Sequence, residues 1–411
     1  MPSVKPANPS RNEFVILIAS VMMIVAFAID SMLPALPAIG NSLGVSNEND
    51  RQLVVSIFLL GFGVAQLFVG TFSDRYGRRG IILCALIAFA VTSLLASLAQ
   101  SYELLLVARF TQGIACAGAR VVVTSIVRDR YEGRAMAQIM SMASMIFMAA
   151  PILAPLMGQI VLTFGPWRWI FGALAIIAVL IWGWVLFRLP ETLMPQNRTP
   201  ISIANIRTSA RTVIFDRLSL GYSLAMAAIS CGLFSFLLSV QQIFDHVFKR
   251  ADFLPTGFAI MAAAMAAASL LNASIVKRYG MRLIGHSALI FFTFMAGVHV
   301  VVAISGYETL VTFITLQAIM MMGFSLVAGN FSAMAMENMG GVAGVASSLQ
   351  GSLANIVGAV VGTLLGQTFN GTTVPLYLGY FGCGAAALII IFVTEHGRLF
   401  VARNAPHVLG V

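Results

Sequence analysis

Charged residues are scarce in this chain. Lysine and arginine together number 24 and aspartate and glutamate 15, so only 9% of the 411 residues are charged, whereas about a quarter are charged in an ordinary soluble domain. The hydrophobic share is 59%. So few charges cannot cover the surface of a protein of this size, and most of that surface must face lipid. The composition excludes a soluble globular protein and predicts an integral membrane protein.

Cysteine is also rare, and the motifs that mark common catalytic sites are absent. The four cysteines stand singly inside apolar runs, which predicts small core residues rather than a zinc site or a disulfide framework. No GxxxxGK(S/T) phosphate loop, HExxH zinc motif or glycine-flanked nucleophilic serine occurs. We therefore expect no enzyme, no metal site, no cofactor and no nucleotide hydrolysis as an energy source.

Long apolar runs recur along the whole chain. A membrane-spanning helix needs about 20 mostly apolar residues, whereas barrel strands alternate over about 10. Lys5 and Arg11 precede the first run as in a signal peptide, but no cleavage pattern follows, so we expect an uncleaved span. The sequence predicts an all-α membrane protein with twelve transmembrane helices at residues 14–37, 52–72, 81–99, 104–127, 136–164, 167–187, 218–241, 254–276, 283–304, 308–336, 342–369 and 374–394.

The longest polar stretch divides these helices into two sets of six. An internal repeat supports the division, because Arg75-Tyr76-Gly77 after the second span returns 203 residues later as Arg278-Tyr279-Gly280 after the eighth. Two pseudo-symmetric six-helix halves are typical of transporters that bind substrate between the halves near mid-membrane. We expect, in order, an N-tail, an N-terminal bundle, a linker, a C-terminal bundle and a C-tail at residues 1–13, 14–189, 190–217, 218–394 and 395–411.

The basic residues indicate the orientation in the membrane. With the N-terminus inside, 18 of the 24 basic residues fall on the cytoplasmic side and only four on the other. Such an excess is typical of cytoplasmic loops. We therefore expect both termini in the cytoplasm, and we interpret the net charge of +9 as a topology signal rather than a nucleic-acid-binding surface.

Asp30 is the only acidic residue well inside a predicted span. A carboxylate at bilayer depth costs about 2.5 to 3.5 kcal/mol on insertion scales, which makes it a functional candidate by default. Pro34 cannot donate to the Asp30 carbonyl, and Pro37 likewise frees the carbonyl of Leu33, so we expect the first span to be interrupted beside its acid. The alternative is a structural acid paired permanently with an arginine.

Arg109 in the fourth span is the expected partner of Asp30. At ~1.5 Å per residue, the two lie roughly 24 and 27 Å from the cytoplasmic ends of their helices. Gln112 shares a face with Arg109. Arg120 lies on that face nearer the cytoplasm, where it would line an inner vestibule or pair with Asp129. Because burial and a nearby cation have opposite effects on carboxyl protonation, Asp30 and Arg109 are predicted to couple transport to protons.

The loop between the second and third spans is a candidate conformational latch. Its small residues permit close approach and a left-handed turn, and its acid can pair with basic residues or cap a helix. The expected latch residues are Gly70, Asp74, Arg75, Gly77, Arg78 and Arg79. In the second-half copy Lys277 stands at the position equivalent to Asp74, so this latch is expected in one half only.

Prolines and a glycine inside the fifth span predict a kink, with ordinary tolerance of proline in membrane helices as the alternative. Together with the first span, the expected helix-kink residues are Pro34, Pro37, Pro151, Pro155 and Gly158.

Flexible methionines and aromatic residues would suit a permissive drug pocket, with lipid contact or core packing as the alternative. The expected substrate contacts are Asp30, Arg109, Gln112, Phe234, Phe236 and Met145. Four intramembrane amides could serve either as pocket groups or as interhelical hydrogen bonds: Asn272, Asn330, Gln350 and Asn355.

Over essentially the whole chain, these features resemble the major facilitator superfamily. The stretch from Gly70 to Arg79 matches that superfamily's loop signature, GxxxDRxGRR. The stretches 30–37, 109–113 and 167–171 resemble the bicyclomycin/chloramphenicol-resistance branch of its drug/proton antiporters. The resemblance implies the major facilitator fold, with Asp30 as the proton carrier, Arg109 as its coupling partner and Gln112 in support.

We therefore expect proton-coupled efflux (antiport) of small, mostly apolar drugs such as antibiotics, by alternating access across the bacterial cytoplasmic (inner) membrane. One acid and one arginine favour neutral or zwitterionic substrates over dications. Expected partners are the substrate, protons and the lipid bilayer, with no nucleic acid, and the protein is expected to be monomeric. The alternatives are a major facilitator porter for a physiological metabolite or siderophore, as exporter or proton symporter, and a non-transporting receptor or scaffold.

Overall fold

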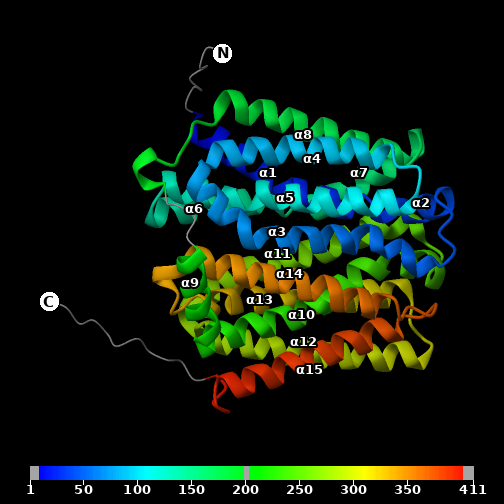
Figure 1. Ribbon diagram of the computed structural model, residues 1–411. Helices are drawn as coiled ribbons and strands as arrows, with labels where there is room; N and C mark the ends of the chain where they lie inside the picture. Colours follow the sequence, from blue (N-terminus) through cyan, green and yellow to red (C-terminus); the bar gives the residue numbers. More distant parts are fainter. Residues whose placement is uncertain (1–8, 199–202, 401–411) are drawn as a thin grey trace.

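The structure is a computed structural model that describes residues 9–198 and 203–400. Within those residues the chain is helical and contains no strand, so the all-α prediction is confirmed (Figure 1). The α-helices are α1 (Arg11–Asp30), α2 (Leu36–Ser42), α3 (Leu53–Tyr76), α4 (Arg78–Ser97), α5 (Tyr102–Arg130), α6 (Gly133–Phe147), α7 (Ala150–Phe164), α8 (Arg168–Arg188), α9 (Ile203–Phe215), α10 (Arg217–Gln242), α11 (Leu254–Tyr279), α12 (Met281–Ser305), α13 (Leu310–Ala335), α14 (Ala343–Gly366) and α15 (Val374–Thr394). Shorter helical turns are η1 (Leu33–Ala35), η2 (Glu48–Gln52), η3 (Pro195–Asn197), η4 (Ile243–Val247), η5 (Ala251–Phe253) and η6 (Gly340–Val342).

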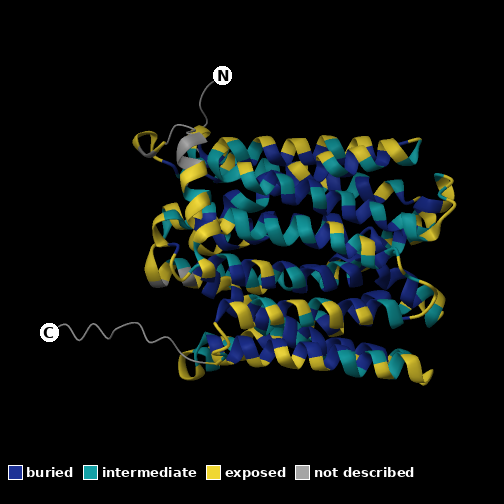
Figure 2. Ribbon diagram, turned by 60° about the horizontal axis from the view of Figure 1, so that its bottom comes forward, coloured by how far each residue is buried: buried dark blue, intermediate teal, exposed yellow. Residues whose placement is uncertain are grey.

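Twelve helical segments in the described part of the chain are long and apolar enough to cross a membrane, as the sequence predicted. Figure 2 shows that buried residues lie between the helices, whereas exposed residues lie at the two ends and on the outer helix faces. Many exposed side chains are large and apolar, such as Leu98, Phe164 and Leu180. Apolar outer faces of this extent are suited to lipid contact.

The helices are arranged side by side in two groups along the chain. Figure 1 shows α1 to α8 in one part of the molecule and α10 to α15 in the other. Between the two groups, α3 packs against α14 and α7 against α11. The start of α1 and the end of α15 lie at one end of the molecule, which we call the terminal end, and α2 lies at the other, which we call the opposite end (Figure 1).

The first span is interrupted beside its acid, as predicted. Helix α1 ends at Asp30, a turn at Ser31 and Met32 follows, and the chain continues through η1 into α2. The Ser31 hydroxyl donates to the Phe27 carbonyl at 2.5 Å. Pro34 has no N–H to continue the helical ladder, which explains why the break falls where it does.

The fifth span is also divided, before the first of its two prolines. Helix α6 ends at Phe147 and α7 begins at Ala150, one residue before Pro151. Helix α7 then continues without a break through Pro155 and Gly158. Of the three residues expected to kink this span, only Pro151 therefore lies next to the division.

Gly158 has a packing role at the break in the first span. A Cβ atom added to Gly158 would lie only 2.1 Å from the Ser31 carbonyl oxygen and 3.3 Å from Pro34 Cγ. Because no side chain intervenes, the backbone of α7 rests directly against the turn that follows Asp30. The glycine therefore allows the fifth span to support the interruption of the first.

The variant Gly158→Ala is expected to lower the unfolding temperature of the purified protein in detergent, because its Cβ would overlap the Ser31 carbonyl and force α7 away. Overpacking of this kind costs about 1 to 3 kcal/mol. Gly172→Ala in α8 is the matched control, since a Cβ there would meet nothing within 4 Å. Equal unfolding temperatures for the two variants at the same scan rate would contradict the packing role of Gly158.

Candidate functional site

Arg109 is fully buried in the interior of α5. Its Nε donates to the Val54 carbonyl at 2.8 Å, and its Nη2 donates to the Ala28 carbonyl at 3.0 Å. Its Nη1 donates to Oε1 of Gln112 at 2.6 Å. The guanidinium also lies over the Phe58 ring, 4.5 Å from the centroid. Carbonyl dipoles, one amide and an aromatic face therefore solvate this cation inside the helix bundle.

Gln112 connects this cluster to a further helix. While its Oε1 accepts from Arg109, its Nε2 donates to the Ser93 hydroxyl of α4 at 2.6 Å. Both polar ends of the buried amide are thus occupied. Gln112 therefore holds the guanidinium of Arg109 and links α5 to α4.

Asp30 is only 6% exposed and is the last residue of α1. Within residues 9–198 and 203–400, its carboxyl group takes part in no hydrogen bond and no ion pair. A carboxyl group that no protein group holds in place can exchange a proton whenever water reaches it. The turn that follows it is the only break within the first span, so the acid lies where the backbone is least regular.

Arg109 contacts the end of α1 near Asp30, but no ion pair joins the two residues in the described part of the chain. Arg109 donates to the carbonyl of Ala28, two residues before Asp30. The guanidinium therefore holds the end of α1 through its backbone while leaving the carboxyl group unpaired. The expected salt bridge is absent from this conformation, in which Arg109 donates instead to carbonyl and amide oxygens.

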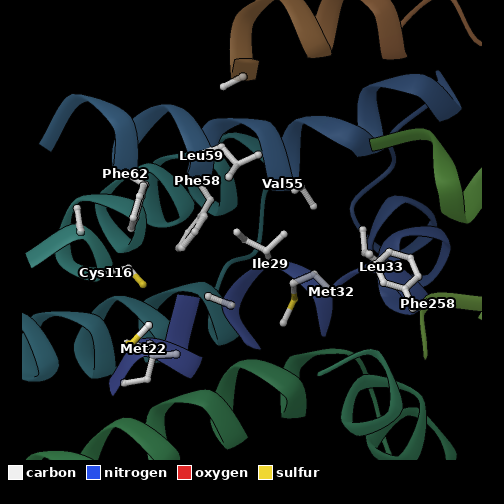
Figure 3. Close-up of a cluster of buried hydrophobic side chains, with 14 of the residues drawn as sticks. Met22, Ile29, Met32, Leu33, Val55, Phe58, Leu59, Phe62, Cys116 and Phe258 are labelled. Atoms are coloured by element: carbon white, nitrogen blue, oxygen red, sulfur yellow. The ribbon is translucent and has the colours of Figure 1, made fainter. Parts of the chain in front are cut away.

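An apolar cluster surrounds the break. Figure 3 shows Ile29, Met32 and Leu33 of the first span among side chains of α3 that include Val55 and Phe58. These residues are nearly inaccessible to solvent. The polar groups of the site are therefore enclosed by hydrocarbon, where electrostatic interactions are stronger than in water.

A cavity of about 1100 Å³ lies between the two groups of helices, toward the terminal end. Residues of α3, α5, α9 and α14 line it. Its polar lining includes Gln66, Thr71, Asp74, Arg120, Thr124, Ser125, Arg128, Ser209, Ser347, Ser348 and Asn355, and its apolar lining includes Phe62, Leu67, Phe68, Phe72, Val121 and Leu349. None of the six expected substrate contacts, all of which lie in the described ranges, is among its lining residues.

The two aromatic candidates for the pocket are used in packing. Phe236 is buried and stacks on Phe258 of α11, with ring centroids 5.9 Å apart. Phe234 fills the space above Gly358 of α14, where an added Cβ would lie 2.6 Å from its ring. Met145 is 54% exposed and does not line the cavity. In this conformation both phenylalanines have the core-packing role that we considered as the alternative.

The intramembrane amides of the second half bond mainly to neighbouring helices. Asn330 donates to Oδ1 of Asn272 at 2.8 Å and so joins α13 to α11. Gln350 donates to a carbonyl at the end of α13 at 3.1 Å. Asn355 donates to Oε1 of Gln66 at 2.9 Å, and this bond crosses between the two groups of helices. Only Asn355 both lines the cavity and makes an interhelical bond.

The expected latch is a set of contacts around Arg78. Gly77 has a φ of +96°, which glycine adopts readily, and it separates α3 from α4. Arg78 then pairs with Asp74, donates to Oδ2 of Asp129 at 2.9 Å and donates to the Ser73 hydroxyl at 2.6 Å. These bonds tie the ends of three helices together at the terminal end.

The other latch residues contact different groups. An added Cβ on Gly70 would lie 3.5 Å from the Ser348 hydroxyl of α14, so the two groups of helices are in contact here. Arg79 donates to the carbonyl of Leu186 at 2.7 Å. Arg75 lies over the ring of its neighbour, 5.5 Å from the centroid.

Glu191 belongs to the latch, although the sequence analysis missed it. Its carboxylate accepts from the backbone N–H of Arg78 at 2.9 Å and of Arg79 at 3.2 Å. An acid at this position caps the start of α4 and complements its helix dipole. Glu191 follows the sixth span, 113 residues after Arg78, so no local pattern could have indicated this contact.

The second half has an ion-pair cluster of its own around Arg282, although its loop has no acid equivalent to Asp74. Gly280 has a φ of +80° and separates α11 from α12 as Gly77 separates α3 from α4. Arg282 then pairs with Glu337 at 2.8 Å and Glu395 at 3.0 Å. The hydroxyl of Tyr222 also donates to Glu395, at 2.7 Å. The acids come from the ends of α13 and α15 instead of from the loop, which is why Lys277 did not reveal them.

Neutral amides join the two groups of helices at the opposite end. Gln52 donates to Oε1 of Gln242 at 2.6 Å and to the Gly366 carbonyl at 3.1 Å. Asn49 accepts from Gln242 at 2.9 Å and donates to the Gln367 carbonyl at 3.0 Å. The sequence analysis missed these residues, which we call the amide bridge. The molecule is thus bridged at the opposite end and contains a cavity toward the terminal end.

Comparisons with known proteins give a consistent result. The family model described as "Major Facilitator Superfamily" matches residues 18–363. An uncharacterised transporter of the same type from Bacillus subtilis is 30% identical over 90% of this chain and 92% of its own length. A bicyclomycin resistance protein homolog from Haemophilus influenzae is 28% identical over 92% and 94%. Multidrug resistance protein MdtL from Salmonella paratyphi A is 27% identical over 94% and 96%.

Solved structures share the fold. The human organic anion transporter MFSD10 superposes with a TM-score of 0.67 at 18% identity, covering 95% of this chain and 99% of the other. A D-xylose-proton symporter superposes with a TM-score of 0.68 at 13% identity, covering 94% and 98%.

The variant Arg109→Lys is expected to lower the unfolding temperature, because one ammonium group cannot reach two carbonyls and Gln112 at once. Each buried acceptor left without its donor costs about 1 to 3 kcal/mol. The matched control is Arg211→Lys in α9, where the exposed guanidinium lies over Phe215. Unfolding is followed in detergent by intrinsic fluorescence. An unchanged unfolding temperature for Arg109→Lys would contradict the anchoring role of its hydrogen bonds.

Proposed function

This chain belongs to the major facilitator superfamily, and from that membership we propose that it exports small, mostly apolar drugs in exchange for protons. It is a transporter rather than an enzyme. The names of the bicyclomycin and multidrug resistance relatives support drug efflux. The observation that carries the proton-coupled part is Asp30, a nearly buried acid at the break in the first span, with no ion pair or hydrogen bond to the described chain.

We assign Asp30 the role of proton carrier and Arg109 that of positioning residue. Arg109 holds the end of α1 by its bond to the Ala28 carbonyl. A proton that reaches Asp30 from one side neutralises the only acid within the first span's interior, and its release to the other side restores the charge. Each inward proton contributes about 1.4 kcal/mol per pH unit and about 2.3 kcal/mol per 100 mV.

The proposal places the terminal end in the cytoplasm of a bacterial cell. The excess of basic residues in segments at that end supports this orientation. The cavity then opens toward the cytoplasm, and the amide bridge closes the external side. This is the arrangement of an inward-facing state in an alternating-access cycle, in which a drug enters from the cytoplasm before the bridge opens.

A porter for a physiological solute, including a proton symporter, would use the same architecture. Substrate identity and the direction of proton movement distinguish these alternatives. When solute is added outside everted vesicles, an antiporter raises the pH of the lumen as the solute enters, whereas a symporter lowers that pH because proton and solute enter together. Everted vesicles loaded with a pH-sensitive dye measure this direction directly.

The variant Asp30→Asn is expected to abolish proton-driven drug efflux while leaving folding and drug binding intact, because the amide has a similar shape but cannot carry a proton. Efflux and proton movement are measured in everted vesicles energised by respiration. The matched control is Asp252→Asn, since Asp252 is exposed at the opposite end and pairs with Arg250. Full proton-coupled efflux by Asp30→Asn would refute the assignment.

Cross-linking the amide bridge is expected to stop transport. In a background in which the four native cysteines are replaced by alanine, Gln52→Cys and Gln242→Cys place two thiols where the side chains now bond. A short bifunctional thiol reagent then holds the opposite end closed, so a drug can enter the cavity but cannot leave on the other side. Each single-cysteine variant treated with the same reagent is the control. Continued transport by the cross-linked protein would contradict alternating access across this bridge.

A further inference from the structure

Arg120 lines the cavity without a partner. It lies on α5, eleven residues after Arg109, and its side chain is half-buried. In the part of the chain that the structure describes, its guanidinium takes part in no hydrogen bond and no ion pair. Arg109, by contrast, uses all three of its nitrogens. Five N–H donors of Arg120 are therefore available to a molecule that enters the cavity.

The acids near Arg120 are already engaged. Asp129, which the sequence analysis considered as its partner, pairs with Arg78 at 2.9 Å. Asp74 is the only acid among the cavity's lining residues within the described chain, and it also pairs with Arg78. The lining has a second cation, Arg128, which is exposed and likewise lacks an ion pair there. The cavity thus has two uncompensated positive charges and no free carboxylate.

The aromatic and hydroxyl residues that line the cavity indicate the other chemical features of a suitable ligand. Phe62, Phe68 and Phe72 of α3 supply aromatic surface. Hydroxyl groups near Arg120 come from Thr124 and Ser125, one helical turn further along α5. At about 1100 Å³ the cavity is at the upper end of the size range of small-molecule pockets. An apolar ring system with one anionic group would match both the aromatic and the cationic lining.

We propose that Arg120 is the anion-binding residue of the substrate cavity and that the transported compounds include organic anions, with an apolar body and one carboxylate, sulfonate or comparable group. This inference rests on the proposed export function and extends its substrate class from the neutral or zwitterionic compounds favoured by Asp30 and Arg109 to organic anions. Arginine is suited to this role, because its planar fork forms paired, charge-assisted hydrogen bonds to such groups.

Export of an anion also fits the energetics of the proposed exchange. One anion moving outward and one proton moving inward both transfer positive charge toward the cytoplasm. A membrane potential that is negative inside therefore assists both movements. When an uncharged drug is exchanged for one proton, the membrane potential assists only the movement of the proton.

A pair of fluorescent probes with the same apolar body tests the proposal. 1-Anilinonaphthalene-8-sulfonate has an anionic group that the neutral N-phenyl-1-naphthylamine lacks. We expect Arg120→Gln to weaken binding of the sulfonate about tenfold, because a charge-assisted hydrogen bond is lost, and to leave binding of the neutral probe unchanged. Binding is measured by titration of the full chain in nanodiscs, with empty nanodiscs subtracted, and export in everted vesicles.

Three variants complete the design. Arg120→Lys keeps the charge and is expected to retain most of the preference for the sulfonate. Arg128→Gln tests whether the second cation contributes to binding of the sulfonate. It remains informative if Arg120→Gln does not fold. Arg211→Gln removes the same charge from the exposed surface of α9, outside the cavity lining, and is the matched control.

The outcomes separate this inference from the function on which it rests. If Arg120→Gln weakened binding of both probes equally, Arg120 would have a structural role and the inference would be overturned. Unchanged sulfonate binding in a folded Arg120→Gln variant would overturn it as well. Proton-driven export of the neutral probe by the unmodified protein would still support the transporter function in either case. Absence of proton-driven export of both probes by the unmodified protein would count against the proposed function itself, and the inference would fall with it.

Discussion

A buried guanidinium must have an acceptor for its donors, and this requirement organises the core of the first half. Arg109 meets it with the carbonyls of Ala28 and Val54, which belong to α1 and α3. Because those acceptors are backbone atoms on two other helices, satisfying the cation also fixes both helices against α5. The end of α1 is thereby held two residues before Asp30. The position of the candidate proton carrier follows from the solvation of its neighbour instead of from a direct ion pair.

In both halves, ion pairs around one buried arginine hold helix ends together, but the acids come from different positions in the chain. Each has a glycine of positive φ between two helices, Gly77 in one and Gly280 in the other, followed by a buried arginine that binds two acids. In the first half one acid lies within the loop signature, whereas in the second both lie at distant helix ends. The geometry of the repeat is thus more closely maintained than its residues. A search for the repeated sequence motif alone therefore identifies Gly280 but not the acids Glu337 and Glu395 that pair with Arg282.

The fold and part of the candidate site could be predicted from the sequence. Apolar runs give the twelve spans, and Pro34 accounts for the interruption beside Asp30 because it removes a backbone donor. The bonds of Arg109 could not be predicted, since a backbone carbonyl has no sequence signature. Glu191 and Gln242 contact residues more than a hundred positions away, and nothing in their neighbourhoods indicates it. A cavity between the halves lined by Arg120 is among the expectations from the sequence, but the rest of its lining could not be predicted, since it depends on how two groups of helices meet.

The two ends of the molecule are held by different contacts. The opposite end is joined across the two groups of helices by the uncharged amide bridge and by a contact of His246 with Glu48 at 3.3 Å, whereas the terminal end has an ion-pair cluster within each group. The amide bridge of Gln52 and Gln242 is uncharged, so neither salt nor acidity alters its strength appreciably. At the terminal end, the clusters around Arg78 and Arg282 include partly exposed acids. Dissolved ions weaken the attraction of these partly exposed acids for their arginines, with a screening length of about 10 Å at 0.1 M. The ionic composition on the terminal side therefore influences how readily the helix ends held by these two clusters separate.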